Sequence, residues 1–132
     1  ERTAVDVVGV QGFDADHLRA GNLGQQLGAQ LRAFVVQHAG AERGGHAHKK
    51  LQQFLIALSG SFDVVLNDAE EEQVVTLNKP FEGLLITNGI WRELKNFSSG
   101  AVCLVIASEV FEEEDYIRDF NDFVDYKIND KP

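Results

Sequence analysis

The chain has a single cysteine, Cys103, so it cannot form an internal disulfide. Cys103 lies within the apolar run 101–107. A free thiol in such a run usually behaves as a small buried hydrophobic residue and not as a nucleophile. A chain without internal disulfides needs no oxidising compartment, and we expect this one to work in the reducing cytoplasm.

Positive charge is also scarce. Lys and Arg together number 12 against 21 Asp and Glu, which gives a formal net charge of −9. This balance argues against nucleic acid or an anionic membrane surface as the main partner. It does not exclude a small anionic ligand, because a few arginines can reverse the field inside a pocket. No apolar run approaches the roughly 20 residues that would span a bilayer.

Methionine is absent, and the chain begins at Glu1. We therefore expect a domain excised from a longer polypeptide. Residues 1–132 have the length of one domain, large enough to bury a single hydrophobic core.

Short apolar segments separated by turn residues run through most of the chain, a pattern that favours an all-β sandwich or barrel. We expect Ser59-Gly60-Ser61 to form a tight hairpin between two of these strands. The expected strands cover residues 4–10, 31–37, 46–48, 53–58, 62–66, 73–77, 83–87, 91–97 and 101–107.

Residues 111–126 change character and alternate acids with aromatic residues. The spacing of Tyr116, Phe120 and Phe123 predicts a short amphipathic helix that lies against the barrel. The acids 112–115 would stand at its N-terminal end as a solvated face, where they favour the helix dipole.

Two of the four histidines, His46 and His48, are spaced i and i+2. On a strand this spacing places both imidazoles on one face, about 7 Å apart. Such a pair can bind a metal or move protons, or it can be an exposed or core pair with no function. Arg43 and the two lysines that flank the pair concentrate positive charge there, which favours a functional site.

A metal site is the weaker of the two functional interpretations. The segment fits the first motif of metal-binding cupins, which is His-x-His, four residues, Glu, six residues and Gly, but position 53 is Gln. No histidine follows His48 to complete the site. Two imidazoles and an amide bind metal poorly, because tight sites use three or four ligands that include carboxylate or thiolate. A metal-dependent cupin that recruits Asp63 or Glu93 stays an alternative, but we expect no metal and no cofactor.

Proton transfer is the other functional interpretation. Imidazoles titrate near pH 6.5 and can remove a proton beside a ketone and return it to the neighbouring carbon. The oxyanion formed on the way needs a positive or hydrogen-bonding group. Arg43, Arg92 and the second imidazole are the candidates for this role.

Several separated segments, in the same order, resemble the sugar-nucleotide 3,4-ketoisomerases of the WxcM-like (FdtA) family. The resemblance covers roughly residues 31–125. The matching segments are residues 43–49, 53–60, 83–84, 91–98, 104–108 and 115–120.

This resemblance implies a metal-free, RmlC-like cupin jelly-roll barrel that forms a homodimer with exchanged strands. It further implies isomerisation of a dTDP-4-keto-6-deoxyhexose to its 3-keto isomer, a step towards amino sugars of bacterial surface glycans. His46 and His48 match the catalytic pair, and we take His48 as the leading C3 base, with His46 relaying the proton or polarising a carbonyl. The expected substrate-binding residues are Arg32, Arg43, Gln53, Arg92 and Asn96.

The chain departs from the family pattern in two places. The family usually has a tyrosine just after the basic residue that Arg32 matches, whereas this chain has Phe34 and no hydroxyl. Residues 16–21 only approximate the usual Asp-x-Arg-Gly pattern. These departures keep open a second interpretation, a non-catalytic cupin that binds a sugar nucleotide or serves as an accessory domain.

Overall fold

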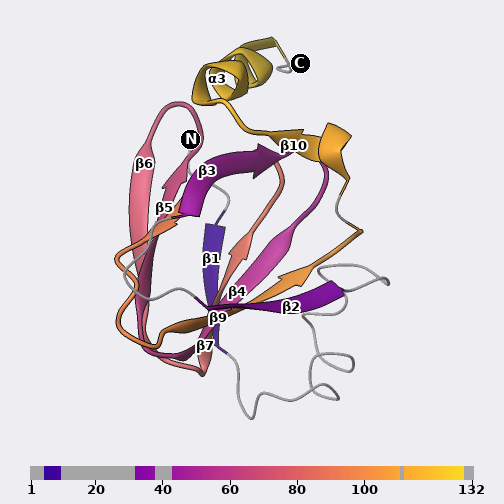
Figure 1. Ribbon diagram of the computed structural model, residues 1–132. Coiled ribbons are helices and arrows are strands. Elements are labelled where there is room, and N and C mark those ends of the chain that lie inside the picture. The colour runs from indigo at the N-terminus through magenta and orange to yellow at the C-terminus, as the bar shows by residue number, and fades with distance from the viewer. Residues whose placement is uncertain (1–4, 10–31, 38–42, 111, 130–132) are drawn as a thin grey trace.

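The structure is a computed structural model that describes residues 5–9, 32–37, 43–110 and 112–129, with only the backbone path for residues 5–9, 32–37, 43 and 44 (Figure 1). Two antiparallel sheets of five strands face each other. The first has the order β1-β7-β4-β9-β2 and the second the order β10-β3-β8-β5-β6. The elements are β1 (Val5–Gly9), β2 (Arg32–Gln37), β3 (Arg43–His48), β4 (Gln53–Ser59), β5 (Phe62–Asn67), β6 (Glu72–Leu77), β7 (Glu82–Ile86), β8 (Trp91–Lys95), β9 (Val102–Ala107), η1 (Glu113–Asp115), β10 (Tyr116–Ile117) and α3 (Phe120–Asn129). The all-β prediction with a short C-terminal helix is confirmed.

The main hydrophobic core lies between the two sheets. Leu55 and Ala57 of β4 belong to it, together with Cys103 and Val105 of the neighbouring strand β9. The prediction that Cys103 is a buried core residue is confirmed, since its side chain is 0% exposed. The residues that alternate with these along the two strands, such as Phe54, are also buried. Both faces of the sheet are therefore covered here, which is why β4 and β9 are apolar at nearly every position.

The turn at residues 59–61 is not a hairpin, contrary to the sequence-based expectation. β4 pairs with β7 and β9 in one sheet, whereas β5 pairs with β6 and β8 in the other. Gly60 has φ +69°, which suits glycine. The Ser61 amide donates to the Ser98 hydroxyl at 2.9 Å, and the Ser98 amide donates to the Ser61 carbonyl at 2.9 Å. The turn signal was correct, but the chain uses it to cross between sheets.

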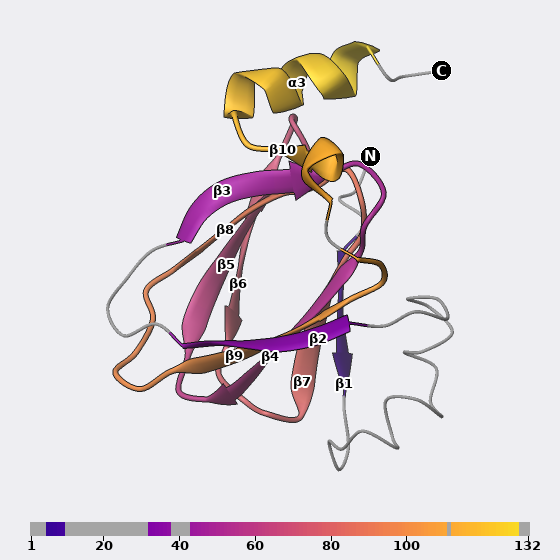
Figure 2. The same cartoon turned by 45° about the vertical axis from the view of Figure 1, so that its right-hand side comes forward.

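The C-terminal helix α3 covers the outer face of β3 and β10, as Figures 1 and 2 both show. Phe123 is 0% exposed and packs with Ala47, Trp91 and Ile117. The helix prediction is confirmed for Phe120 and Phe123 but wrong for Tyr116, which lies in β10 opposite His48. None of the described helices is long and apolar enough to cross a membrane.

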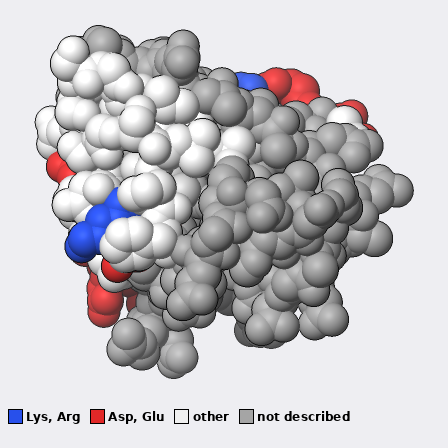
Figure 3. All heavy atoms as spheres, turned by 90° about the horizontal axis from the view of Figure 1, so that it is seen from below, with Lys and Arg blue, Asp and Glu red and all other residues white. Residues whose placement is uncertain are grey.

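The surface of the described residues carries scattered charges. On the face seen in Figure 3, the described part is mostly uncharged, with separate acidic and basic groups and no continuous basic patch. The side chain of Val74, on the edge strand β6, is 55% exposed.

Gly45 allows the Trp91 ring to lie against the backbone of β3. A Cβ at this position would overlap the buried indole, which also contacts Phe120 and Phe123. We therefore expect Gly45→Ala to lower the free energy of unfolding by about 2 kcal/mol, the usual cost of overpacking a core. Urea unfolding would measure this loss as a lower midpoint concentration with an unchanged m-value.

The control for this variant is Val74→Ala on the exposed edge strand β6. It should change stability by no more than about 0.5 kcal/mol, as surface substitutions usually do. Equal stability of Gly45→Ala and Val74→Ala would show that Trp91 does not need the bare backbone at Gly45.

Candidate active site

The histidine pair lies on the face of β3 that is turned away from α3. The centroids of the His46 and His48 rings are 4.9 Å apart, and the two ring planes are nearly perpendicular at 87°. His48 is fully buried and His46 is half-buried. Ala47, between them, packs on the opposite face under the helix. The prediction that both imidazoles share one face is therefore confirmed.

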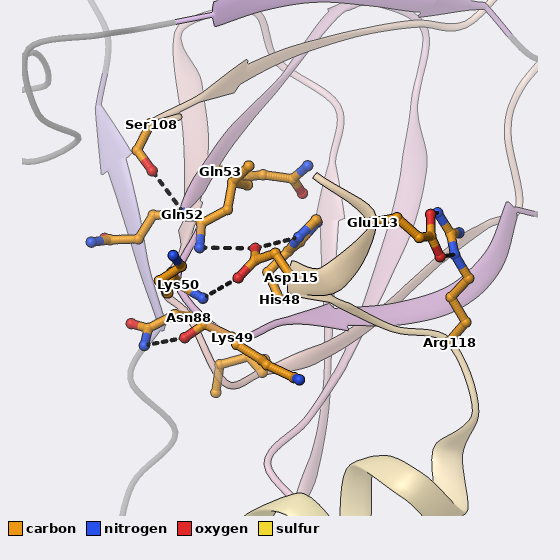
Figure 4. A network of polar contacts seen from close by, with 12 residues as sticks. His48, Lys49, Lys50, Gln52, Gln53, Asn88, Ser108, Glu113, Asp115 and Arg118 are labelled. Atoms are coloured by element: carbon orange, nitrogen blue, oxygen red, sulfur yellow. Dashed lines mark hydrogen bonds and ion pairs between the residues drawn. The ribbon is translucent and has the colours of Figure 1, made fainter. Parts of the chain in front are cut away.

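Asp115 reaches His48 from the short 3-10 helix η1, as Figure 4 shows. His48 Nδ1 lies 3.2 Å from Asp115 Oδ2. The same carboxylate accepts the backbone N–H of Lys50 at 2.7 Å and of Leu51 at 3.2 Å. Asp115 is only 7% exposed. The expectation that this acid belongs to a solvated face is wrong.

Tyr116 joins the pair because β10 adds to the edge of β3 with Tyr116 opposite His48. Its ring centroid is 4.4 Å from that of His48 and 5.4 Å from that of His46. Arg118 stacks on the Tyr116 ring, with its guanidinium carbon 4.0 Å from the ring centroid. Burial raises the pKa of Tyr116, so the phenol stays protonated at neutral pH.

Arg92 of β8 lies opposite His46 in the neighbouring strand and is only 1% exposed. Its Nη1 donates to Gln53 Oε1 at 2.6 Å, and its Nη2 and Nε donate to the Ile90 carbonyl at 2.9 and 3.3 Å. Because Gln53 belongs to β4, the first of these bonds joins the two sheets. None of the described carboxylates forms an ion pair with Arg92.

Burial sets the protonation of this cluster. It lowers the pKa of Arg92 to about 9, which still leaves the guanidinium charged at neutral pH. Burial and then the Arg92 charge lower the pKa of His48 from 6.5 to about 4, although Asp115 opposes the shift. At neutral pH His48 is therefore an uncharged imidazole able to accept a proton.

The structure brings together His46, His48, Gln53 and Arg92 of the predicted site residues. Asn96 is not among them: it is exposed, has φ +58°, and its amide donates to Asp63 at 2.8 Å. It lies four residues beyond Arg92 along the same segment, about 13 Å away in an extended chain.

The two remaining predicted residues are described only by their backbone. Arg32 is paired with Ala107, which is also paired with Gln53, so Arg32 and Gln53 lie in one row across the sheet. Arg43 begins β3 opposite Leu94. The approximate family pattern at residues 16–21 lies outside the described residues.

The site also contains residues that sequence reasoning missed, namely Asp115, Tyr116 and Arg118. The only signal for them was the matching segment 115–120, which was not assigned a role. In the described part of the chain, no three His, Cys, Asp or Glu side chains gather as a candidate metal site.

Residues 29–128 match the model of the family described as FdtA, WxcM-like, C-terminal. The chain belongs to this family. It is 46% identical over 99 residues to the TDP-4-oxo-6-deoxy-alpha-D-glucose-3,4-oxoisomerase of Aneurinibacillus thermoaerophilus, a match that covers 73% of this chain and 71% of the relative.

Solved structures of ketoisomerases resemble this WxcM-like chain as well. The WlaRB TDP-quinovose 3,4-ketoisomerase of Campylobacter jejuni is 43% identical with a TM-score of 0.68, over 71% of this chain and 74% of that one. WlaRA, a TDP-fucose-3,4-ketoisomerase of the same organism, is 25% identical with a TM-score of 0.83, over 97% and 98%. The Mycobacterium tuberculosis rmlC epimerase, 16% identical with a TM-score of 0.58 over 74% and 56%, shares the fold alone. The predicted RmlC-like cupin barrel and WxcM-like family are confirmed.

Proposed function

We propose that the chain is a sugar-nucleotide 3,4-ketoisomerase, which converts a dTDP-4-keto-6-deoxyhexose to its 3-keto isomer. Family membership and the oxoisomerase relative support this activity. One observation in the structure carries it: a buried arginine without a carboxylate partner among the described residues lies beside a buried, uncharged histidine. This arrangement suits a reaction in which a base removes a proton and negative charge develops on an oxygen.

The reaction needs only proton movements. A base removes the proton from C3, and the C–H electron pair becomes the C3–C4 double bond of an enediolate with its charge on O4. O4 then gains a proton and O3 loses one, while C4 is protonated and the C3 carbonyl forms. Substrate and product have the same formula and oxidation level, so no redox cofactor is consumed.

The described residues supply groups for removal of the C3 proton, for the proton relay and for stabilisation of the oxyanion. His48 is the base for C3, because it is uncharged at neutral pH. His46, in ring contact with His48, relays the proton or polarises a carbonyl. Arg92 stabilises the developing oxyanion, and Gln53 holds the guanidinium in place.

The predicted binding residues Arg32 and Arg43 would hold the nucleotide phosphates or sugar oxygens. We further propose that the chain works in the cytoplasm as a homodimer, without metal and without nucleic acid or membrane as a partner. The buried thiol of Cys103 suits a reducing compartment.

The pH dependence of kcat/KM should reflect the low pKa of His48. A base is active when deprotonated, so its activity is lost only as the pH falls through its folded-state pKa of about 4. A histidine with an ordinary pKa near 6.5 would lose about 90% of its activity at pH 5.5. We therefore expect kcat/KM to stay constant within about twofold from pH 5.5 to 8. A half-maximal rate near pH 6.5 would contradict the assignment of His48.

The direct test is incubation of the purified chain with dTDP-4-keto-6-deoxyglucose, with the products followed by NMR. We expect conversion to the 3-keto isomer by the unchanged chain. The double variant His46→Asn, His48→Asn should give no conversion. The alternative, a non-catalytic sugar-nucleotide-binding cupin, is favoured by the lack of a hydroxyl at Phe34. Calorimetric binding of dTDP without any turnover would establish that alternative.

A further inference from the structure

The Tyr116 ring completes a cluster of three rings on the face of β3 and β10 that is turned away from α3. Tyr116 stands directly opposite His48 in the antiparallel pair, so the two side chains leave the sheet on the same face. Its ring centroid lies 4.4 Å from that of His48 and 5.4 Å from that of His46, and the two imidazoles are 4.9 Å apart. The next residue, Ile117, packs with Ala47 on the opposite face. The phenol therefore belongs to the site and not to the packing of the helix.

The isomerisation moves protons at two adjacent carbons of the sugar. The C3 proton leaves to a base, and C4 must gain a proton once the enediolate has formed. C3 and C4 are joined by one carbon–carbon bond, which is about 1.5 Å long. The donor for C4 must therefore stand beside the base for C3, within hydrogen-bond reach of the next carbon. The three rings meet this requirement with either imidazole as the base.

Tyr116 is the group of this cluster best suited to donate a proton at neutral pH. Burial raises the pKa of its phenol, against the smaller effects of the Arg118 and Arg92 charges, so the hydroxyl keeps its proton. Burial lowers the pKa of His48 to about 4, so this imidazole is uncharged and a far weaker acid than a phenol. Arg92 stays charged at neutral pH and serves the oxyanion instead.

Arg118 is placed to stabilise the phenolate that remains when Tyr116 gives up its proton. Its guanidinium carbon lies 4.0 Å from the Tyr116 ring centroid. Its Nε and Nη2 donate to the Glu113 carboxylate at 2.9 and 3.0 Å, and this fork holds the guanidinium in place (Figure 4). A nearby cation favours the charged form of a phenol. Tyr116 also lines an open cavity with Lys49, Arg118 and Tyr126, from which the phenolate can regain a proton from solvent.

We propose that the Tyr116 hydroxyl is the catalytic acid that delivers the proton to C4. The proposal rests on the proposed function. The O3 hydroxyl loses its proton, and the electron pair of the broken bond forms the C3 carbonyl. The electron pair of the C3–C4 double bond takes the Tyr116 proton and becomes the C4–H bond, which leaves a phenolate. Two protons leave the sugar, from C3 and O3, and two are gained, at C4 and O4, so solvent restores both the imidazole and the phenol.

Tyr116→Phe keeps the ring and removes only the hydroxyl. We expect this variant to lower kcat for isomerisation about 100-fold, within the range of general acid catalysis. KM for dTDP-4-keto-6-deoxyglucose should change by less than about twofold. The matched control is Tyr126→Phe, the same substitution at the other tyrosine of the chain, which lies on α3 and lines the same cavity. Its kcat should stay within about twofold of that of the unchanged chain.

Exchange at C3 separates a lost acid from a disturbed site. The base does not need the Tyr116 hydroxyl to remove the C3 proton and return a solvent hydrogen to the same carbon. In deuterated water we therefore expect Tyr116→Phe to introduce deuterium at C3 of the recovered 4-keto substrate at no less than about half the rate of the unchanged chain. Formation of the 3-keto product should fall about 100-fold in the same sample. A purely structural role of Tyr116 would lower both rates together.

An equal loss of C3 exchange and of isomerisation in Tyr116→Phe would overturn the proposal, and so would an undiminished kcat. If the variant does not fold, the unchanged protein decides, with substrate deuterated at C3 in ordinary water. Deuterium carried from C3 to C4 would show that one base serves both carbons and would overturn the acid role, whereas only solvent hydrogen at C4 would support it. Absence of both turnover and C3 exchange in the unchanged protein would refute the proposed function, and the role of Tyr116 with it.

Discussion

His48→Asn is expected to lower kcat by about 10⁴-fold while the fold is retained. The variant removes the nitrogen that takes the C3 proton, and general base catalysis contributes up to about this factor. Asparagine is the suitable replacement because its NH2 group can take the place of Nδ1 and donate to Asp115. The buried carboxylate then keeps a partner, and the loss of activity reports chemistry and not an unpaired buried charge. Steady-state kinetics with dTDP-4-keto-6-deoxyglucose would measure it.

The control is His46→Asn, the same substitution on the half-buried member of the pair. We expect a smaller loss of about 10²-fold, since a relay or a polarising group is easier to replace with water than the base itself. If His46→Asn were the more damaging of the two, the roles of the histidines would be reversed. If both variants kept full kcat, neither histidine would be catalytic.

Arg92→Met is expected to give the second largest effect, a fall of about 10³-fold in kcat/KM. The substitution keeps a long side chain but removes the positive charge beside the developing oxyanion, and loss of one such donor usually costs about 10²- to 10³-fold. Removing this charge also raises the pKa of His48, because the Arg92 charge is the second cause that lowers it. The loss of activity on acidification should therefore begin at a higher pH in this variant.

Stability separates this catalytic role from a structural one. Arg92 is a buried cation whose described partners are an amide and a carbonyl, and a fully buried charge is costly to desolvate. Its replacement leaves Gln53 Oε1 without its donor, so the best-matched variant is Arg92→Met combined with Gln53→Leu. We expect this double variant to unfold at the same or a higher urea concentration than the unchanged chain. A severe loss of stability together with activity would indicate that Arg92 mainly holds the two sheets together.

The strands and the histidine face could be predicted from the sequence because they depend on local periodicity. Apolar residues at nearly every position marked β4 and β9, and the i, i+2 spacing placed His46 and His48 on one face. The crossing at Gly60 could not be predicted, because a turn between sheets and a hairpin use the same residues. In the structure, Ser61 of this crossing is hydrogen-bonded to Ser98 of a second turn, 37 residues away.

The acid and the phenol of the site were missed for a related reason. Asp115 stands in a run of acids that looks solvated, and only its contact with a strand 67 residues away makes it a buried acceptor. Tyr116 fits a helical spacing with Phe120, but pairing with the free edge of β3 overrides that local preference. Gln53 was predicted to bind substrate, and in the structure its side-chain oxygen accepts a hydrogen bond from Arg92.

Incorporation of solvent deuterium distinguishes catalysis by the histidine pair from mere binding of the sugar nucleotide. The chain would be incubated with dTDP-4-keto-6-deoxyglucose in deuterated water and the sugar protons followed by NMR. A histidine that takes the C3 proton can exchange it with solvent before C4 is protonated, so we expect deuterium at C4 of a new 3-keto product. His48→Asn should abolish this signal. Well-folded protein that binds dTDP yet shows neither isomerisation nor exchange would contradict the ketoisomerase activity proposed for this chain.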